Sequence, residues 1–394
     1  MKSIDLFIFV DALGWELTSR LGFLNDDFER NRCETVFGYS STCDPCILTG
    51  ASPVEHGHFS FFVKATGETP LSRLKALNIL PQNRVFDRLF QSKINRLSAL
   101  YLGCSGYFDL YNVPYKNFRF LDYTEKKDIY LPDGILGGQR TIFEIWEERG
   151  RKWERSDWRL SDDENIASMR SHLEEGEIEL GYLFTWRLDA TMHRYGARGP
   201  EVEKTLAEFE ASIRDLREVA ERKYDEVRIH IFGDHGMADT RWSSDMMQRF
   251  DREFPTGYGN EHTVVWDSTM ARFWFGCDQR RRDIVAWLEG QGDGRILSDT
   301  ELESMGVLFP DRKYGEVFYL LPEGVIFAPS YMSSGWVTGM HGFHPSDPCS
   351  AAAWVSNVPN CEVGKLTGIF DQMELASREP NIVSTPKASS MAPA

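Results

Sequence analysis

The hydrophobic and polar positions of the chain alternate between short apolar runs and longer segments with a helical period. Four runs have the length and the abrupt polar ends of buried strands: residues 6–10, 97–102, 180–185 and 227–232. Strands that alternate with helices are typical of a sheet whose strands run mainly parallel. The pattern therefore predicts an α/β fold with a mainly parallel central sheet and helices on both faces.

The clearest helix lies between the last two of these runs. Its apolar side chains recur at steps of three and four residues: Leu206, Phe209, Ile213, Leu216 and Ala220. A helix here would make residues 180–185 and 227–232 the two strands of a right-handed crossover. Shorter periodic segments predict further helices at 141–149, 164–174 and 282–290.

The domain organisation follows from what separates these elements. The chain has no internal repeat and no low-complexity linker, so we expect one catalytic domain over residues 1–378. Residues 62–140 are rich in aromatic and turn-forming residues and show no clean period. We interpret them as an inserted segment that covers the active-site edge of the sheet. Residues 379–394 are mostly Pro, Ser, Ala and Lys, a composition that predicts a disordered tail.

Charge and composition narrow the class of partner. The formal net charge of -16 disfavours a nucleic-acid polymer or a membrane surface as a general partner, because polyanions would be repelled on average. A small anionic substrate stays compatible, since bound metal ions reverse the field locally. Nothing in the sequence indicates the oligomeric state.

Seven cysteines occur without the spacing of a disulfide framework, which indicates reduced thiols. The apolar run at 6–10 is too short for a signal peptide, and no stretch of the chain is long enough to span a bilayer. The expected location is the cytoplasm.

Two of the predicted strands end in side chains that bind metal ions. Asp11 directly follows the run 6–10, and the pair Asp234 and His235 follows the run 227–232. Ligands bind beyond the carboxyl ends of the strands in open α/β sheets, so these residues stand where metal ligands are expected. Asp11 alone would also suit the cap of a helix.

Further metal-binding side chains and a group of hydroxyls occur elsewhere along the chain. Asp189 and His193 are one helical turn apart, so both can bind one ion, and His341 lies in a glycine-flanked loop. Ser40, Ser41 and Thr42 open a segment that can offer a nucleophile beside backbone N–H groups, although such clusters also serve as caps. Three aspartates, three histidines and a hydroxyl together suffice for two metal sites of mixed nitrogen and oxygen ligands.

The order of these groups resembles the alkaline phosphatase superfamily, and within it the nucleotide pyrophosphatase/phosphodiesterase branch. The phrase Leu48-Thr49-Gly50, with His56-Gly57 after it, resembles the stretch that follows the nucleophile of that branch. The family's nucleophile lies ten residues before this glycine, which here is Ser40. A small shift in the loop would move it to Ser41 or Thr42.

What the resemblance implies is two-metal hydrolysis of phosphate diesters or pyrophosphates through a phosphoseryl intermediate on Ser40. One divalent ion would be held by Asp189, His193 and His341. The other would be held by Asp11, Asp234 and His235, with Ser40 as its nucleophilic ligand. Nitrogen-rich sites of this kind favour Zn²⁺, with Mn²⁺ as the alternative. The partner would be a small phosphorylated substrate.

Other members of the superfamily are the main alternatives. Sulfatases need Pro and Arg two and four residues after the nucleophile, where this chain has Thr42 and Asp44. Phosphosugar mutases carry the last histidine soon after the Asp-His pair, whereas His341 follows much later. A phosphomonoesterase stays open, and so does a non-catalytic metal-binding protein, although no ligand or nucleophile is missing.

The substrate contacts differ from the family pattern at one position. The branch commonly has an Asn a few residues after the His-Gly pair, and residues 58–62 contain none. Either His58 or Ser60 donates that hydrogen bond instead, or the substrate differs from that of the branch. His344, three residues after His341, is a candidate contact for a ligand or the substrate, with a solvent-facing loop position as the alternative.

Overall fold

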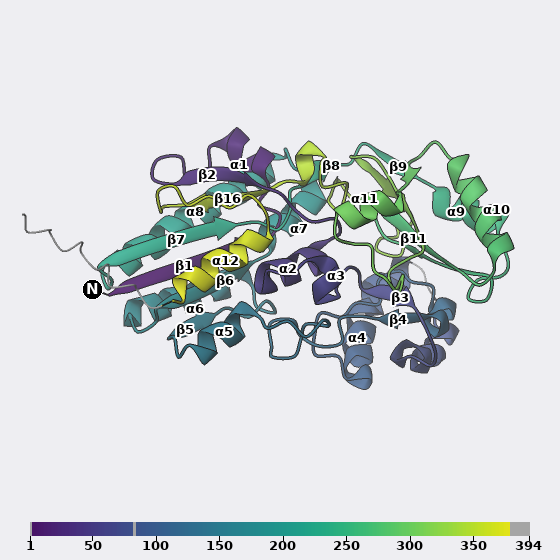
Figure 1. Ribbon diagram of the computed structural model, residues 1–394, viewed down its shortest axis with the longest axis horizontal. Helices are drawn as coiled ribbons and strands as arrows, with labels where there is room; N and C mark the ends of the chain where they lie inside the picture. The colour runs from purple at the N-terminus through teal and green to yellow at the C-terminus, as the bar shows by residue number, and fades with distance from the viewer. Residues whose placement is uncertain (1, 82–83, 379–394) are drawn as a thin grey trace, which may run out of the picture.

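A six-stranded sheet forms the centre of the larger lobe of the computed structural model, which describes residues 2–81 and 84–378 (Figure 1). Its strand order is β2-β16-β7-β1-β6-β5. The bounds in that order are Glu29–Cys33, Ala352–Ser356, Glu226–Phe232, Ser3–Val10, Leu180–Thr185 and Trp153–Arg155. Strands β7, β1, β6 and β5 are parallel, whereas β16 is antiparallel to both of its neighbours. The predicted mainly parallel sheet is confirmed.

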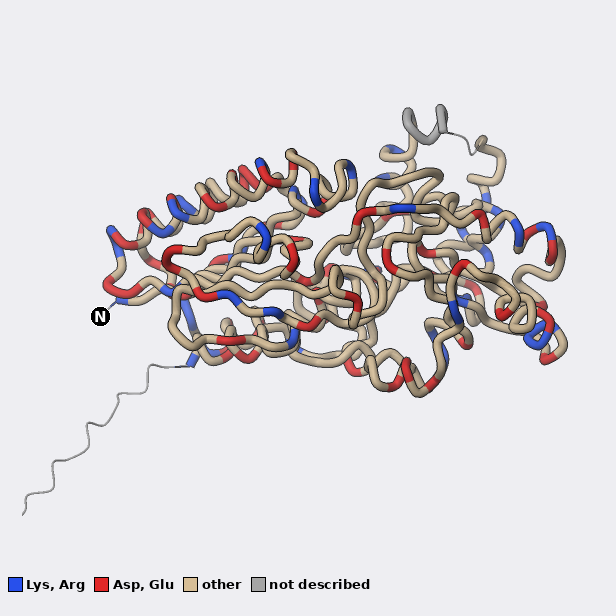
Figure 2. The backbone as a smooth tube through the Cα atoms, turned by 90° about the horizontal axis from the view of Figure 1, so that it is seen from above, with Lys and Arg blue, Asp and Glu red and all other residues tan. Residues whose placement is uncertain are grey.

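Helices cover both faces of this sheet, as predicted. On one face, apolar side chains pack from α1 (Trp15–Leu21), α6 (Asp162–Glu175), α7 (Arg187–Tyr195) and α8 (Pro200–Glu221). On the other, α2 (Ser40–Thr49), α5 (Ile142–Glu148) and α12 (Thr367–Ala376) pack on the aromatic side of β1, β6 and β16. Helix α8 buries the predicted stripe from Leu206 to Ala220, because its apolar positions share one face. Figure 2 shows acidic and basic positions interspersed along the outer helices.

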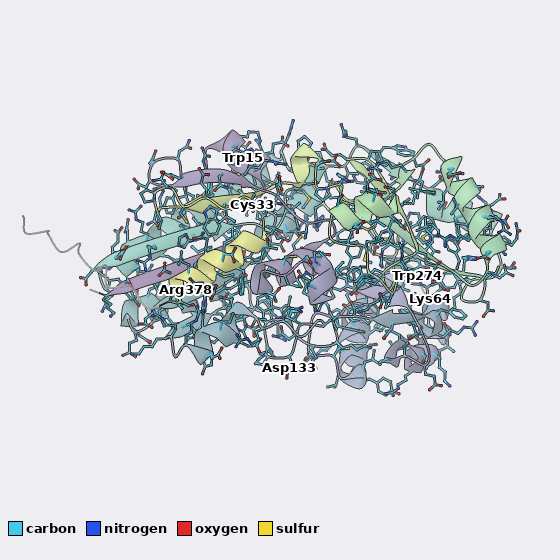
Figure 3. All side chains as sticks on the ribbon, viewed as in Figure 1. Trp15, Cys33, Lys64, Asp133, Trp274 and Arg378 are labelled. Atoms are coloured by element: carbon cyan, nitrogen blue, oxygen red, sulfur yellow. The ribbon has the colours of Figure 1, made fainter. Side chains whose placement is uncertain are left out.

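A second lobe is built around a four-stranded antiparallel sheet. Its order is β10 (His262–Trp266), β11 (Met270–Phe275), β13 (Val317–Leu320) and β12 (Arg295–Ile296). The same lobe holds the pair β3 (Phe62–Lys64) and β4 (Leu121–Tyr123), the helices α4 (Arg84–Leu102), α9 (Met246–Glu253), α10 (Asp278–Glu289) and α11 (Asp299–Ser304), and the 3₁₀ helices Pro70–Ile79 and Tyr115–Phe120. Figure 3 shows Cys33 in the first lobe and Lys64 and Trp274 close together in the second.

The core of the second lobe joins two distant parts of the sequence. Buried side chains from 62–123 and from 246–331 belong to one hydrophobic cluster. The predicted inserted segment thus shares its core with a later part of the chain. The single catalytic domain over residues 1–378 stays a prediction, and the predicted tail at 379–394 lies outside the described residues.

One predicted strand is wrong. Residues 97–102 form the last turns of α4, where Leu97 is 65% and Leu100 is 80% exposed while Ser98 is buried. A short apolar run does not by itself distinguish a strand from a helix, and here the helical period decides which side chains face the core. The predicted helices at 141–149, 164–174 and 282–290 correspond to α5, α6 and α10. Within residues 2–81 and 84–378, no helix is long and apolar enough to cross a membrane.

Candidate active site

The residues that follow three parallel strands lie at one edge of the large sheet. Asp11 follows β1, Asp189 lies in the first turn of α7 after β6, and Asp234 and His235 follow β7. Because β7, β1 and β6 are hydrogen-bonded neighbours, their carboxyl ends meet at this edge. The strand order therefore brings together carboxylates that are far apart in the sequence.

His341 arrives from a different part of the chain through a short strand pair. β15 (Gly339–Met340) pairs antiparallel with β8 (Ala238–Asp239), which begins three residues after His235. A Cβ at Gly339 would clash with the carbonyl oxygen of Met192, so glycine permits the close approach of β15 to α7. The His341 ring consequently stacks on the His235 ring, with centroids 3.7 Å apart.

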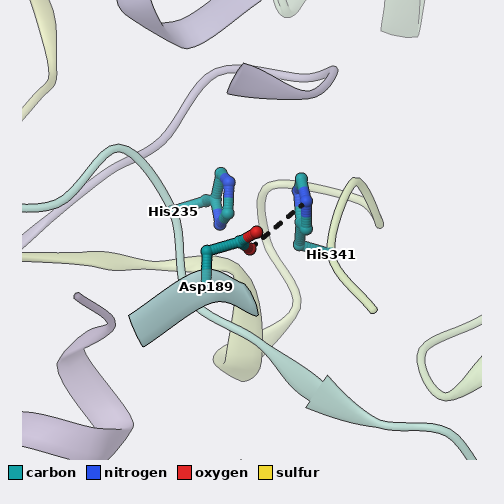
Figure 4. A group of neighbouring side chains, drawn as sticks. All are labelled: Asp189, His235 and His341. Atoms are coloured by element: carbon teal, nitrogen blue, oxygen red, sulfur yellow. Dashed lines mark ion pairs between the residues drawn. The ribbon is translucent and has the colours of Figure 1, made fainter. Parts of the chain in front are cut away.

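Five of these side chains form two overlapping groups that suit metal ions. Their ligand atoms lie within 4.8 Å of one another in each group: Asp11, Asp234 and His235, and Asp189, His235 and His341 (Figure 4). The Nε2 atom of His235 is 3.1 Å from Asp234 Oδ2 and 3.6 Å from Asp11 Oδ1. The Nε2 atom of His341 is 3.8 Å from Asp189 Oδ1.

His193 is the remaining Asp or His side chain that the sequence predicts as a metal ligand. Its Nε2 lies 3.3 Å from Asp189 Oδ1, one helical turn away on α7, and its Nδ1 lies 2.8 Å from the carbonyl oxygen of Gly339. The contact of Nδ1 with the Gly339 carbonyl oxygen fixes the orientation of the ring, so that Nε2 faces the Asp189 carboxylate. The structure thus places together the six Asp and His side chains that were predicted as metal ligands, with His235 near both groups. How they divide between two ions stays a prediction.

The donor atoms fit bound cations. Asp11 Oδ1, Asp189 Oδ1 and His341 Nδ1 are buried without a hydrogen-bond partner, an arrangement that costs stability unless an ion satisfies it. Burial, followed by the charges of Asp234 and Asp189, raises the pKa of Asp11 well above its usual range. Burial also raises the pKa of Asp189. A divalent cation beside these carboxylates reverses that direction, because it favours the charged forms.

Ser40 is the first residue of α2 and reaches the same cluster. Its Oγ lies 3.1 Å from His235 Nε2. The hydroxyls of Ser41 and Thr42 instead donate to the carbonyl oxygen of Phe59, at 3.4 and 2.6 Å. Of the three candidate hydroxyls, Ser40 is thus the one that contacts the metal-ligand groups.

A cavity of about 810 Å³ opens beside Ser40, with walls from both lobes. Ser60 lines it, but its Oγ accepts a hydrogen bond from Arg272 Nη2 at 2.7 Å and faces Asp267 Oδ1 at 3.3 Å. His58 is fully buried and its Nε2 accepts from the backbone N–H of Leu136, while His344 is half-buried and its Nδ1 contacts Ser346. Neither histidine belongs to the described residues that line the cavity.

Two cavity residues were not singled out from the sequence as substrate contacts. Asp44 lies one helical turn after Ser40, a spacing that could have identified it. Glu125 follows the three-residue strand β4 and belongs to no motif, so nothing in the sequence signals it. Both line the cavity.

Comparisons with known proteins place the chain in a family and identify structures with a similar fold. The family model described as type I phosphodiesterase / nucleotide pyrophosphatase matches residues 6–282. No curated protein matches the chain by sequence.

Solved structures are similar over nearly the whole chain. Human ectonucleotide pyrophosphatase / phosphodiesterase 5 shares 12% identity with a TM-score of 0.67, covering 95% of this chain and 94% of that chain. The murine protein gives 13% and 0.67, covering 95% of both chains. An inactive variant of the murine protein in complex with AMP gives 13% and 0.67, covering 96% of this chain and 95% of that one. At these identities the likeness shows a shared fold.

Proposed function

Because the chain belongs to the type I phosphodiesterase / nucleotide pyrophosphatase family, we propose that it hydrolyses phosphate diesters or pyrophosphates with Ser40 as the nucleophile. The observation that carries this proposal is the 3.1 Å contact between Ser40 Oγ and His235 Nε2, at the mouth of a cavity of about 810 Å³. The Ser40 hydroxyl is thus adjacent to the Asp and His cluster and to a cavity that can hold a substrate.

Two divalent metal ions complete the proposed site, with Zn²⁺ favoured by the nitrogen donors and Mn²⁺ as the alternative. The ligands divide as follows: Asp189, His193 and His341 for one ion, and Asp11, Asp234, His235 and Ser40 for the other. When bound, the two ions supply positive charge that favours the serine alkoxide and offsets the charge on the attacking and leaving oxygens.

The residues of the chain account for the other parts of the reaction. Ser40 Oγ attacks phosphorus, a phosphoseryl ester forms, and the bond from phosphorus to the leaving oxygen breaks. The first turn of α2 directs the free backbone N–H groups of Ser40 and Ser41 toward phosphate oxygens. A water molecule then hydrolyses the bond from phosphorus to Ser40 Oγ, which releases the phosphate monoester that keeps the second arm and restores the hydroxyl.

The experiment that tests this function combines metal analysis with two chromogenic esters. The purified chain is analysed for bound metal and assayed with bis-p-nitrophenyl phosphate and p-nitrophenyl phosphate. We expect about two divalent ions per chain and faster cleavage of the diester. Faster cleavage of the monoester would instead identify a phosphomonoesterase, and failure to bind any divalent ion on reconstitution would overturn the proposal.

The substrate range is tested in the same assay. AMP is bound in the structure of the murine relative, so nucleoside phosphodiesters and dinucleotides belong in the panel. We propose a small phosphorylated substrate, because the cavity of about 810 Å³ has the size of a small-molecule site.

A further inference from the structure

The cavity beside Ser40 is unusually acidic for a site that takes a phosphate ester. Six carboxylates line it: Asp11, Asp44, Glu125, Asp128, Asp189 and Asp267. Arg159 is the one Lys or Arg among the described residues that line it. A phosphodiester is itself negatively charged, so it is repelled by any cavity carboxylate that lacks a nearby cation.

Four of the six carboxylates have a partner or an assigned role. Asp128 pairs with Arg159 at 2.8 Å, and Asp267 pairs with Arg272 at 2.7 Å. The other two, Asp11 and Asp189, belong to the proposed metal groups. Asp44 and Glu125 remain. In the described part of the chain, no Lys or Arg lies within ion-pair distance of either.

Glu125 is 6% exposed, and its Oε1 has no hydrogen-bond partner. The nearest cationic candidate is His58, whose Nδ1 lies 4.0 Å away and is likewise without a partner. Burial, followed by the charge of Lys313, lowers the pKa of His58 to about 3, and burial raises the pKa of Glu125 to about 8. His58 therefore supplies no positive charge that would favour the ionised form of Glu125. A buried acceptor of this kind indicates a ligand that supplies a donor.

Asp44 also has a carboxyl oxygen that lacks a hydrogen-bond donor. Its Oδ2 accepts a hydrogen bond from the Tyr130 hydroxyl at 3.4 Å, and its Oδ1 has no partner. Because Asp44 is one turn after Ser40 on α2, the two side chains stand about 5–6 Å apart on the same side of the helix. Asp44 and Glu125 line the same cavity, and each has a buried oxygen without a hydrogen-bond partner.

We propose that Asp44 and Glu125 form a subsite for a primary ammonium group carried on a short arm of the phosphodiester substrate. This inference rests on the proposed function and names its substrate class. A primary ammonium brings both the positive charge and the N–H donors that the two carboxylates lack. The span of one helical turn suits an ammonium two carbons beyond the ester oxygen.

The same chemistry excludes other arms from this subsite. A second phosphate brings negative charge and acceptor oxygens but no N–H donor, so it would leave both buried carboxyl oxygens unsatisfied. A trimethylammonium group carries the charge but no N–H donor, so it leaves both acceptor oxygens unsatisfied. The Trp158 and Tyr107 rings also line the cavity, and aromatic faces attract cations of either kind.

Four p-nitrophenyl phosphodiesters that differ only in the second arm test the proposal. The arms are 2-aminoethyl, 2-(trimethylammonio)ethyl, ethyl and a nucleoside 5′-group, each assayed with the metal-loaded full chain. We expect kcat/KM for the aminoethyl ester to exceed that for the ethyl ester by about ten- to a hundredfold, the range expected for hydrogen bonds to charged groups. The trimethylammonio and nucleoside esters should fall below the aminoethyl ester.

Two conservative variants locate the preference, and one distant variant serves as the control. Glu125→Gln and Asp44→Asn should each reduce the ratio of aminoethyl to ethyl kcat/KM by at least about fivefold. Glu177→Gln, an exposed carboxylate outside the cavity lining, should leave the ratio unchanged. Because the readout is a ratio within each variant, a general loss of activity does not imitate the effect.

The outcomes separate this inference from the proposed function. Equal turnover of the aminoethyl and ethyl esters, equal turnover of the aminoethyl and trimethylammonio esters, or a preference that survives in both variants overturns the ammonium subsite. Failure to cleave any of the esters overturns the proposed function instead. In that case calorimetry of 2-aminoethyl phosphate against ethyl phosphate tests the subsite without turnover. Tighter binding of the former that Glu125→Gln abolishes supports it, and equal binding overturns it.

Discussion

Ser40 Oγ lies 3.1 Å from His235 Nε2 and so joins the first turn of α2 to the end of β7. Ser41 and Thr42 turn their hydroxyls to the carbonyl oxygen of Phe59. Of the three adjacent hydroxyls, Ser40 alone contacts a predicted metal ligand. Variants of Ser40 and of Ser41, one residue apart, therefore test which hydroxyl is the nucleophile.

Ser40→Ala should lower the rate of diester cleavage by at least about a thousandfold while metal content is retained, because an essential catalytic group is lost. Ser41→Ala is the matched control, since it removes a neighbouring hydroxyl that contacts only backbone, and it should stay within about tenfold of the parent. Steady-state kinetics with elemental analysis of each variant measure both. Near-parental turnover by Ser40→Ala, with collapse of Ser41→Ala or Thr42→Ala, would assign the nucleophile to one of those hydroxyls.

Removal of divalent metal should abolish activity and also lower the melting temperature. Asp11 Oδ1 and Asp189 Oδ1 are buried without partners, and each such group costs about 1–3 kcal/mol when nothing satisfies it. Chelation followed by scanning calorimetry, with and without added Zn²⁺ or Mn²⁺, measures the shift. Asp189→Asn should bind about one ion fewer than the parent chain. An unchanged melting temperature on chelation and re-addition would argue against ions at these carboxylates.

The elements that were predictable from sequence are those whose apolar pattern is long or sharply bounded. β1 and β6 are almost wholly buried, as is the second half of β7, and residues with metal-binding side chains follow β1 and β7 within two positions. Asp11 and Asp234 could therefore be placed at one sheet edge before any coordinates, because parallel strands share their carboxyl ends.

The second lobe could not be predicted from sequence because its strands are too short to show a pattern. β3 and β4 have three residues each and β12 has two, too few for a period to emerge. Its core also unites segments separated by more than a hundred residues, which no local pattern reports. Glu125 was missed for the same cause: its place in the cavity depends on the pairing of β4 with β3, not on the residues beside it.

Glu125 predicts a stability that depends on pH. Burial, followed by the charge of Asp128, raises its pKa to about 8, whereas in the unfolded chain a glutamate titrates near about 4.3. Between these values the folded state binds one more proton than the unfolded state, so stability falls as pH rises through this window. Glu125→Gln removes that cost and should raise the free energy of unfolding at pH 8 by about 1–3 kcal/mol, with little gain at pH 4.

Urea unfolding of the parent and Glu125→Gln chains at pH 4, 6 and 8 measures this difference. Glu177→Gln serves as the exposed control, whose effect should not vary across the series. A gain that is equal at all three values would show that packing, rather than the proton, accounts for it.

Arg272 anchors the second lobe through a buried network that reaches the cavity. Its side chain is fully buried, with Nε 2.7 Å from Asp267 Oδ2, Nη1 3.0 Å from the carbonyl oxygen of Tyr314, and Nη2 3.0 Å from that of Phe62. Nη2 also donates to Ser60 Oγ at 2.7 Å. One guanidinium therefore ties β11 to β3 and to the cavity wall.

Arg272→Met should destabilise the protein by about 3–5 kcal/mol, because it leaves the Asp267 carboxylate buried without its cation. The double variant Arg272→Met with Asp267→Leu should recover part of that loss, since both charges are then removed. Urea unfolding of the two single variants and the double variant completes the cycle. If the losses of the single variants simply add in the double variant, the pair is not coupled, and the Arg272 contacts to backbone carbonyls alone account for its effect.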